Sequence, residues 1–208
     1  MKKFTVLTIV LLASIAASAG PVTVVFGGFH ASGPQGWAAG FPYFATINGG
    51  PQVDVMCDDW FHGGYVGQTW YANVTDLGTG NLANVRFNGL PNYPTLYKEV
   101  GWLLLQTRVT PLQSDWTDIN FAVWHIFDST APLQGNAGYW YGQAQIEASL
   151  GFPNVNFHDV WIYTPAYPYQ HDPDPNGPQE LLRPVPEPMT LTLLAGGLLG
   201  IWGRKKLL

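Results

Sequence analysis

The feature that most limits how this chain can fold is a pair of apolar segments at its two ends. The first runs from Phe4 to Ala16 behind two lysines, and the second runs from Met189 to Gly203 ahead of a basic cluster. Between the two ends lies a central body of about 145 residues, enough for one domain that hides roughly 70% of its unfolded surface. We therefore expect a single folded body with a targeting segment on each side.

The amino-terminal segment has the three parts of a secretion signal in order. Two lysines form the positive region, an apolar stretch follows, and Ala17 and Ala19 supply the small residues that signal peptidase requires. Cleavage after Ala19 would leave Gly20 as the first mature residue. Because the apolar stretch is too short to cross a bilayer comfortably, residues 1–19 are predicted to be a signal peptide rather than a membrane anchor.

The carboxy-terminal segment is also built in three parts. Pro186, Glu187 and Pro188 come first, the apolar stretch follows, and a basic cluster ends the chain. At about 1.5 Å per helical residue, this stretch reaches only roughly 22 Å, short of a ~30 Å hydrocarbon core. The basic end resists translocation, so we expect it to stay on the cytoplasmic side of the membrane.

This order of parts, over residues 185–208, resembles the PEP-CTERM sorting signal of Gram-negative bacteria that make exopolysaccharide. The resemblance implies that a membrane-embedded exosortase recognises Pro186, Glu187 and Pro188. The enzyme would remove the tail and pass the body from transient inner-membrane anchoring to the cell envelope or matrix. A permanent tail anchor is the alternative, and the amino-terminal signal argues against it.

The first half of the body reads as β-structure. Short aromatic or β-branched runs are separated by Gly, Pro and Asn, which is typical of antiparallel strands. A late run is expected to return to the same sheet. The predicted strands are Val22–Phe26, Tyr43–Ile47, Val53–Cys57, Tyr65–Val74 and Val160–Tyr163.

Helical patterns interrupt the strands. Apolar residues recur at helical spacing from Leu96 to Leu104 and again from Trp116 to Phe127, with Ser114 placed as an N-cap. A weaker pattern runs from Gly142 to Leu150. The body, residues 20–164, is therefore predicted to be α+β: an antiparallel β-rich domain with an inserted part of two to three helices.

Residues 165–184 are rich in Pro, Asp, Tyr and Gly. Proline fixes its own φ and pushes the preceding residue into an extended conformation, so the segment is predicted to be a semi-rigid linker. A calcium loop at Asp172 and Asp174 is not expected, because the prolines that follow each of them prevent the tight turn.

Cys57 is the only cysteine, which excludes an intramolecular disulfide and a zinc site of several thiolates. With Asp59 two residues later, a predicted helix downstream, and Ala122 and Trp124 in the next helix, the chain resembles the bacterial thioester domain over Met56 to Phe127. The resemblance implies an internal thioester between a strand cysteine and a helix glutamine.

In this chain the cysteine maps onto Cys57 and the glutamine onto Asn120. Asparagine is one methylene shorter, so its carbonyl would fall about 1.5 Å short of the thiolate. A misplacement of about 1 Å can cost about 10²-fold in a positioned reaction. An inert relative with a buried structural Cys57 is the favoured interpretation; an intact cross-link and a free reactive thiol remain open.

No catalytic set is predicted. A cysteine hydrolase would need His62 or His125 beside Cys57, with Asp58, Asp59 or Asn120 to orient the imidazole, and no family signature surrounds the cysteine. His125 lies between core-facing positions, where a structural role is favoured. Asp115, Asp118 and Asp128 lie on or beside the same predicted helix. A glycoside hydrolase would need two carboxylates across a sugar-binding cleft, but the first-turn position of Asp115 and Asp118 already explains them.

Aromatic residues make up 14% of the chain, and Tyr139, Trp140 and Tyr141 lie between glycines in a predicted loop. Flat aromatic faces stack on sugars, so this cluster is a candidate for ligand contact as well as for the core.

Only 11% of residues are charged, the net charge is -5, and the basic residues gather at the ends. Nucleic-acid binding is therefore not expected, and neither a cofactor nor a metal is predicted. We expect a secreted, non-enzymatic protein of the cell envelope or exopolysaccharide matrix. Its expected partners are signal peptidase, exosortase, the membrane before processing, and extracellular polysaccharide. A covalent adhesin with a bond at Cys57 and a secreted hydrolase are the alternatives.

Overall fold

The computed structural model describes residues 20–29, 42–110, 113–171 and 173–185. The predicted signal peptide and the predicted sorting tail lie outside these residues. Within them, none of the helices has the length and hydropathy needed to cross a bilayer.

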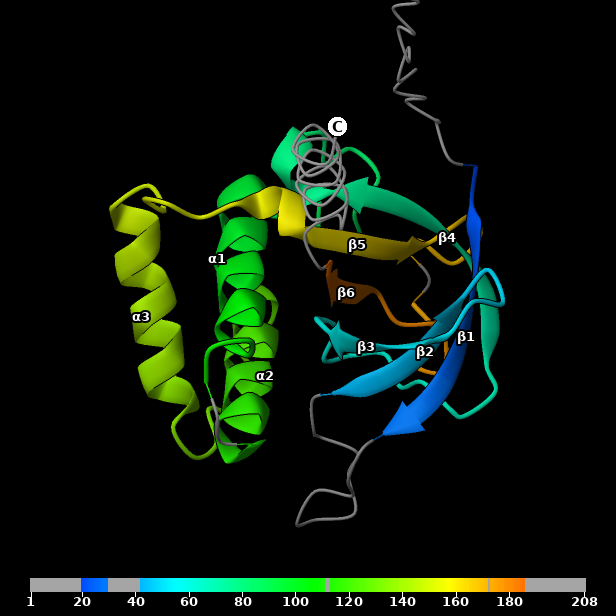
Figure 1. The fold of residues 1–208 in the computed structure, drawn as a ribbon, viewed down its shortest axis with the longest axis horizontal. Helices are drawn as coiled ribbons and strands as arrows, with labels where there is room; N and C mark the ends of the chain where they lie inside the picture. The colour runs from blue at the N-terminus through cyan, green and yellow to red at the C-terminus, as the bar shows by residue number, and fades with distance from the viewer. Residues whose placement is uncertain (1–19, 30–41, 111–112, 172, 186–208) are drawn as a thin grey trace, which may run out of the picture.

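The six strands of the described chain form a closed antiparallel barrel in the order β1-β2-β3-β6-β5-β4 (Figure 1). Along β1, Val22, Val24 and Phe26 point into the core while their neighbours are more exposed, which is the alternation expected of a strand with one buried face. Closure pairs every strand on both sides. The strands are β1 (Val22–Phe29), β2 (Tyr43–Ile47), β3 (Gln52–Cys57), β4 (Thr69–Asp76), β5 (Val160–Pro165) and β6 (Leu181–Pro184).

A tight turn joins β2 to β3. Asn48 and Gly49 both have positive φ, 51° and 66°, and the Gly50 N–H closes the turn onto the carbonyl oxygen of Ile47. The Asn48 side chain also accepts a hydrogen bond from the backbone N–H of Thr23 at 2.9 Å. The turn therefore fixes the β2–β3 register and ties it to β1.

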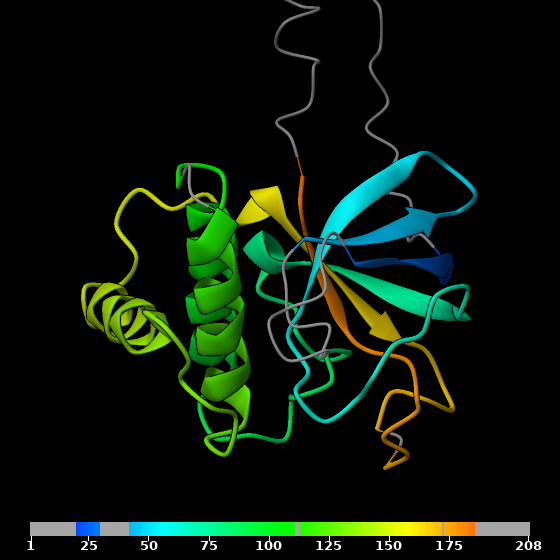
Figure 2. The same cartoon turned by 90° about the horizontal axis from the view of Figure 1, so that it is seen from below.

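The helices α1 (Tyr93–Gln106), α2 (Gln113–Phe127) and α3 (Ala137–Ser149) lie between β4 and β5 in the chain and pack on one side of the barrel (Figures 1 and 2). In both views α3 is the farthest from the strands. Six consecutive residues of α2, 119–124, are buried, so this helix is covered on all sides. Short 3₁₀ turns, η1 (Leu77–Thr79) and η2 (Phe157–Asp159), frame the helical insertion.

The predicted α+β architecture with an inserted helical part is confirmed, and local boundaries differ. The strand predicted from Tyr65 begins at Thr69, because the residues before it form a loop. Ser114 lies inside α2 rather than at its N-cap. Tyr139, Trp140 and Tyr141 lie in α3 rather than in a loop.

The larger difference concerns the predicted linker, residues 165–184. Its last four residues form β6, which pairs with β3 through Cys57 and Leu181 and with β5 through Ile162 and Leu182. Leu181 and Leu182 are fully buried. The prolines of this segment suggested a spacer, but its two adjacent leucines lie in the core. The folded body therefore extends to Pro184 rather than ending at residue 164.

Replacing Leu182 by Ala should lower the free energy of unfolding by about 2–5 kcal/mol, because it leaves a cavity in the closed barrel. Urea denaturation measures the change. Tyr167→Ala is the matched control, since this side chain lies in the same predicted linker and is 93% exposed. Equal effects of the two substitutions would mean that the segment is not part of the core.

Candidate functional site

Cys57 ends β3 and is fully buried. Its sulfur donates a hydrogen bond to the carbonyl oxygen of Asp59 at 3.2 Å and accepts one from the Asp59 backbone N–H at 3.3 Å. Burial raises the pKa of the thiol well above its ordinary value, and the nearby charges of Asp59 and Asp58 raise it further. The thiol is therefore protonated at neutral pH, the opposite of a reactive cysteine with a depressed pKa.

The structure brings Asn120 to Cys57. Asn120 lies on α2, and its Nδ2 donates a hydrogen bond to the backbone oxygen of Cys57 at 2.9 Å. Both residues are buried, and Asn120 Oδ1 has no hydrogen-bond partner among the described residues. The amide thus ties α2 to the end of β3 through the backbone.

Three aromatic rings pack together beside this contact. The ring centroid of Trp60 lies 5.1 Å from that of Trp124 and 6.4 Å from that of Phe121. The Phe121 and Trp124 rings meet edge to face, with their centroids 5.2 Å apart. The indole of Trp124 lies near enough to the sulfur to lower the pKa of Cys57 slightly, although its N–H completes no hydrogen bond. The cluster packs α2 against the loop that follows β3.

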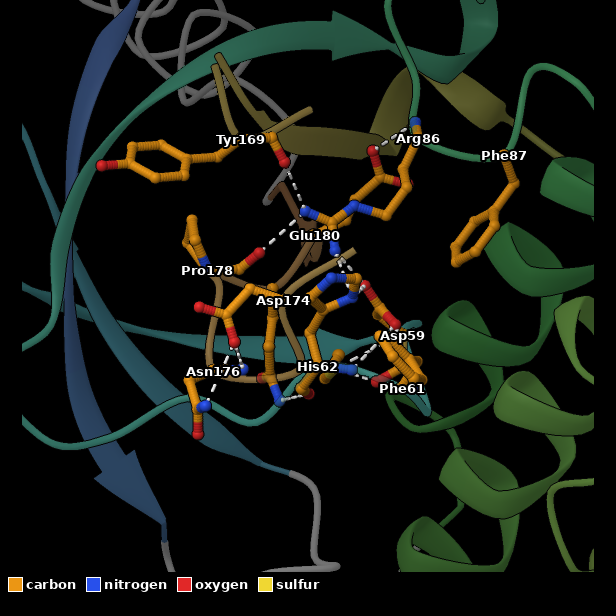
Figure 3. Close-up of polar contacts among 12 residues, drawn as sticks. Asp59, Phe61, His62, Arg86, Phe87, Tyr169, Asp174, Asn176, Pro178 and Glu180 are labelled. Carbon is orange, nitrogen blue, oxygen red and sulfur yellow. Dashed lines mark hydrogen bonds and ion pairs between the residues drawn. The ribbon is translucent and has the colours of Figure 1, made fainter. Parts of the chain in front are cut away.

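Asp59 organises that loop (Figure 3). Its Oδ1 accepts hydrogen bonds from the backbone N–H groups of Phe61 and His62, at 3.0 and 3.2 Å. Its Oδ2 contacts His62 Nδ1 at 2.6 Å and forms an ion pair with Arg86. Burial opposes ionisation of this carboxyl, but the hydrogen bond from His62 and the charge of Arg86 lower its pKa overall.

Arg86 and Glu180 extend the network across the chain. Arg86 Nη2 donates to the carbonyl oxygens of Tyr169 and Pro178, at 3.1 and 2.8 Å (Figure 3). Glu180 is fully buried and lies next to β6. Its carboxylate accepts hydrogen bonds from the Arg86 backbone N–H, the Tyr97 hydroxyl of α1 and the Thr164 hydroxyl of β5.

Asp58 is fully buried, and neither of its carboxyl oxygens has a hydrogen-bond partner among the described residues. Burial raises its pKa well above the ordinary value, and the charge of Glu180 adds to the shift. The shift favours the protonated form of Asp58.

The two histidines named for a hydrolase are engaged elsewhere. His62 Nδ1 lies 2.6 Å from Asp59 and 2.7 Å from Arg86. His125 Nδ1 lies 2.7 Å from the carbonyl oxygen of Ala131, and this contact ties α2 to the loop that follows it. These contacts do not pair either histidine with the Cys57 thiol as a base with its nucleophile.

The carboxylates of α2 hold local structure. Asp118 accepts a hydrogen bond from the Asn136 backbone N–H at 2.8 Å, and Asp128 accepts from the Thr130 backbone N–H at 2.9 Å. Asp115 lies in the first turn of the helix. No group of three or more potential metal ligands occurs in the part of the chain that the structure describes.

The predicted aromatic cluster of α3 does not form one surface. Tyr139 is 60% exposed, whereas Trp140 and Tyr141 are half-buried and pack against the core. The Tyr139 and Trp140 rings meet edge to face at 5.4 Å. Only Tyr139 is well placed for contact with a ligand.

Among the solved structures that resemble this chain are two from Streptococcus pyogenes. The N-terminal domain of the pilus tip adhesin Cpa is 12% identical, with a TM-score of 0.44 over 80% of this chain and 94% of that chain. The N-terminal thioester domain of the fibronectin-binding protein SfbI is 11% identical, with a TM-score of 0.46 over 81% and 94%. No family model and no curated protein matches the chain.

We expect Cys57 to resist thiol reagents in the folded protein, because the sulfur is buried and its pKa is raised. Reaction with Ellman's reagent at mildly alkaline pH should be negligible without denaturant and complete in concentrated urea. Rapid stoichiometric reaction of the native protein would contradict a protected structural thiol.

The raised pKa of Asp58 predicts that stability falls as the pH rises. The folded state keeps a proton that the unfolded state loses above its ordinary value of 3.8, so the stabilising effect is complete in acid and declines at higher pH. Asp58→Asn cannot ionise, and its stability relative to wild type should therefore increase as the pH rises above about 4. Urea melts across this range, with the exposed Asp54→Asn of β3 as control, measure the difference.

Proposed function

We propose that this protein is exported and acts without catalysis in the cell envelope or exopolysaccharide matrix of a Gram-negative bacterium. The observation that carries the proposal is the state of Cys57, the one residue with nucleophilic potential singled out in the sequence. It is buried, has a raised pKa and is engaged with backbone groups. A body built in this way suits a binding or structural role.

The route to the envelope is argued from the two ends. Residues 1–19 have the parts of a cleavable export signal, and Pro186, Glu187 and Pro188 open the sorting tail. Strand β6 ends at Pro184, two residues before that motif in the sequence. In this proposal exosortase acts on the motif while the tail is held in the inner membrane.

A covalent adhesin is the second candidate, favoured by the contact between Asn120 and Cys57. The Cys57 sulfur would attack Asn120 Cγ, forming a C–S bond and breaking the C–N bond. The amide nitrogen would leave as ammonia, taking up the thiol proton. Two contacts oppose this step: the sulfur hydrogen-bonds to Asp59, and the amide nitrogen faces the backbone oxygen of Cys57.

The intact mass of the protein isolated from the envelope of its producing cell tests both candidates. We expect a chain that starts at Gly20, lacks the tail after the Pro186–Pro188 motif, and otherwise has the mass of the unmodified residues. Glu187→Ala should keep the tail and remain with the inner membrane.

A mass lower by one ammonia, restored with methylamine, would identify the covalent adhesin instead. An unprocessed chain recovered from the cytosol would overturn the proposed route.

A further inference from the structure

We propose that Trp60 and Phe61 form a stacking platform for a neutral glycan chain. The platform lies on the loop that follows β3, apart from the aromatic residues 139–141 of α3. The inference rests on the proposed function in one respect: export places the protein against extracellular polymer.

The two rings are exposed but held from below. Trp60 is 37% exposed and packs on Trp124 at 5.1 Å. Phe61 is 56% exposed and meets the buried His62 edge to face at 5.0 Å. Rings fixed in this way lose little conformational freedom when a ligand binds, which favours binding.

The backbone beneath the rings is fixed as well. The Asp59 carboxylate accepts the N–H groups of Phe61 and His62, and Arg86 holds that carboxylate in place (Figure 3). The buried ion pair of Asp59 and Arg86 therefore fixes the backbone that carries the two rings.

The loop that carries the rings is itself uncharged. From Trp60 to Thr75 the sequence has no Asp, Glu, Lys or Arg, and the charged groups that hold the loop, Asp59 and Arg86, are buried. An acidic or basic polymer finds no countercharge within this loop. A neutral sugar places its C–H face against the electron-rich face of an aromatic ring and needs no countercharge.

The size of the platform also favours a sugar over a protein. A full aromatic side chain buries about 150–250 Å², so the exposed fractions of Trp60 and Phe61 offer roughly 200 Å². A stable protein interface takes about 800 Å² from each partner. Two rings suffice for one or two sugar units of a chain.

Affinity electrophoresis in native gels tests this inference. The folded protein is run through gels with hydroxyethylcellulose, dextran, galactomannan or soluble starch, and through gels with alginate as an acidic control. We expect retardation by at least one neutral polymer, with little dependence on salt, and none by alginate. Trp60→Ala and Phe61→Ala should each weaken the retardation about fivefold.

Tyr139→Ala, which removes the exposed ring of α3, is the matched control and should leave the retardation unchanged. Thermal melts confirm that each variant folds, and Trp60→Phe should restore part of the binding if the Ala variant is unstable. Absence of retardation by every neutral polymer, preference for alginate, or loss of retardation only in Tyr139→Ala would each overturn the inference. None of these outcomes changes the mass or processing of the chain, so the two proposals fail separately.

Discussion

The structure depends on one buried guanidinium. Arg86 lies in the segment between β4 and α1, and it contacts the loop after β3 through Asp59 and the approach to β6 through the carbonyl oxygens of Tyr169 and Pro178. These contacts join parts of the chain that are far apart in sequence. Removing one partner of a buried ion pair costs about 3–5 kcal/mol, because the remaining charge stays buried without compensation.

The balance of charge around Arg86 explains the state of its neighbours. Three buried carboxyl groups, Asp58, Asp59 and Glu180, lie in this region. Contact with His62 and the charge of Arg86 lower the pKa of Asp59, while burial and the charge of Glu180 raise that of Asp58. Glu180, fully buried beside β6, accepts hydrogen bonds from the Arg86 backbone and from hydroxyl groups of α1 and β5, and so ties the last strand of the barrel to its neighbours.

The elements that the sequence predicts well are those with a local signal. A run of β-branched and aromatic residues marks β1, and the helical stripe from Leu96 to Leu104 marks α1. Strand β6 has only four residues and a proline-rich approach, so no local pattern separates it from a linker. The aromatic residues from Tyr65 onward have strand propensity, but tertiary contacts place the first of them in a loop.

The charge network has no local signal at all. Asp59 and Arg86 are 27 positions apart, and Arg86 and Glu180 are 94 apart, so only the folded topology brings them together. The sequence offers one indirect indication. Because only 11% of the residues are charged, an arginine in the middle of the body suggests a specific ion pair. The pairing of Cys57 and Asn120 follows from the family resemblance alone, because no local pattern in the sequence links residues 63 positions apart.

The loop after β3 performs two tasks with the same few residues. Its backbone engages the Cys57 sulfur through Asp59, and its next two side chains turn outward as Trp60 and Phe61. A thiol that is buried and protonated is slow to oxidise. Asp59 therefore takes part in both tasks: its backbone engages the Cys57 sulfur, and its carboxylate fixes the backbone of the residues that carry the exposed rings.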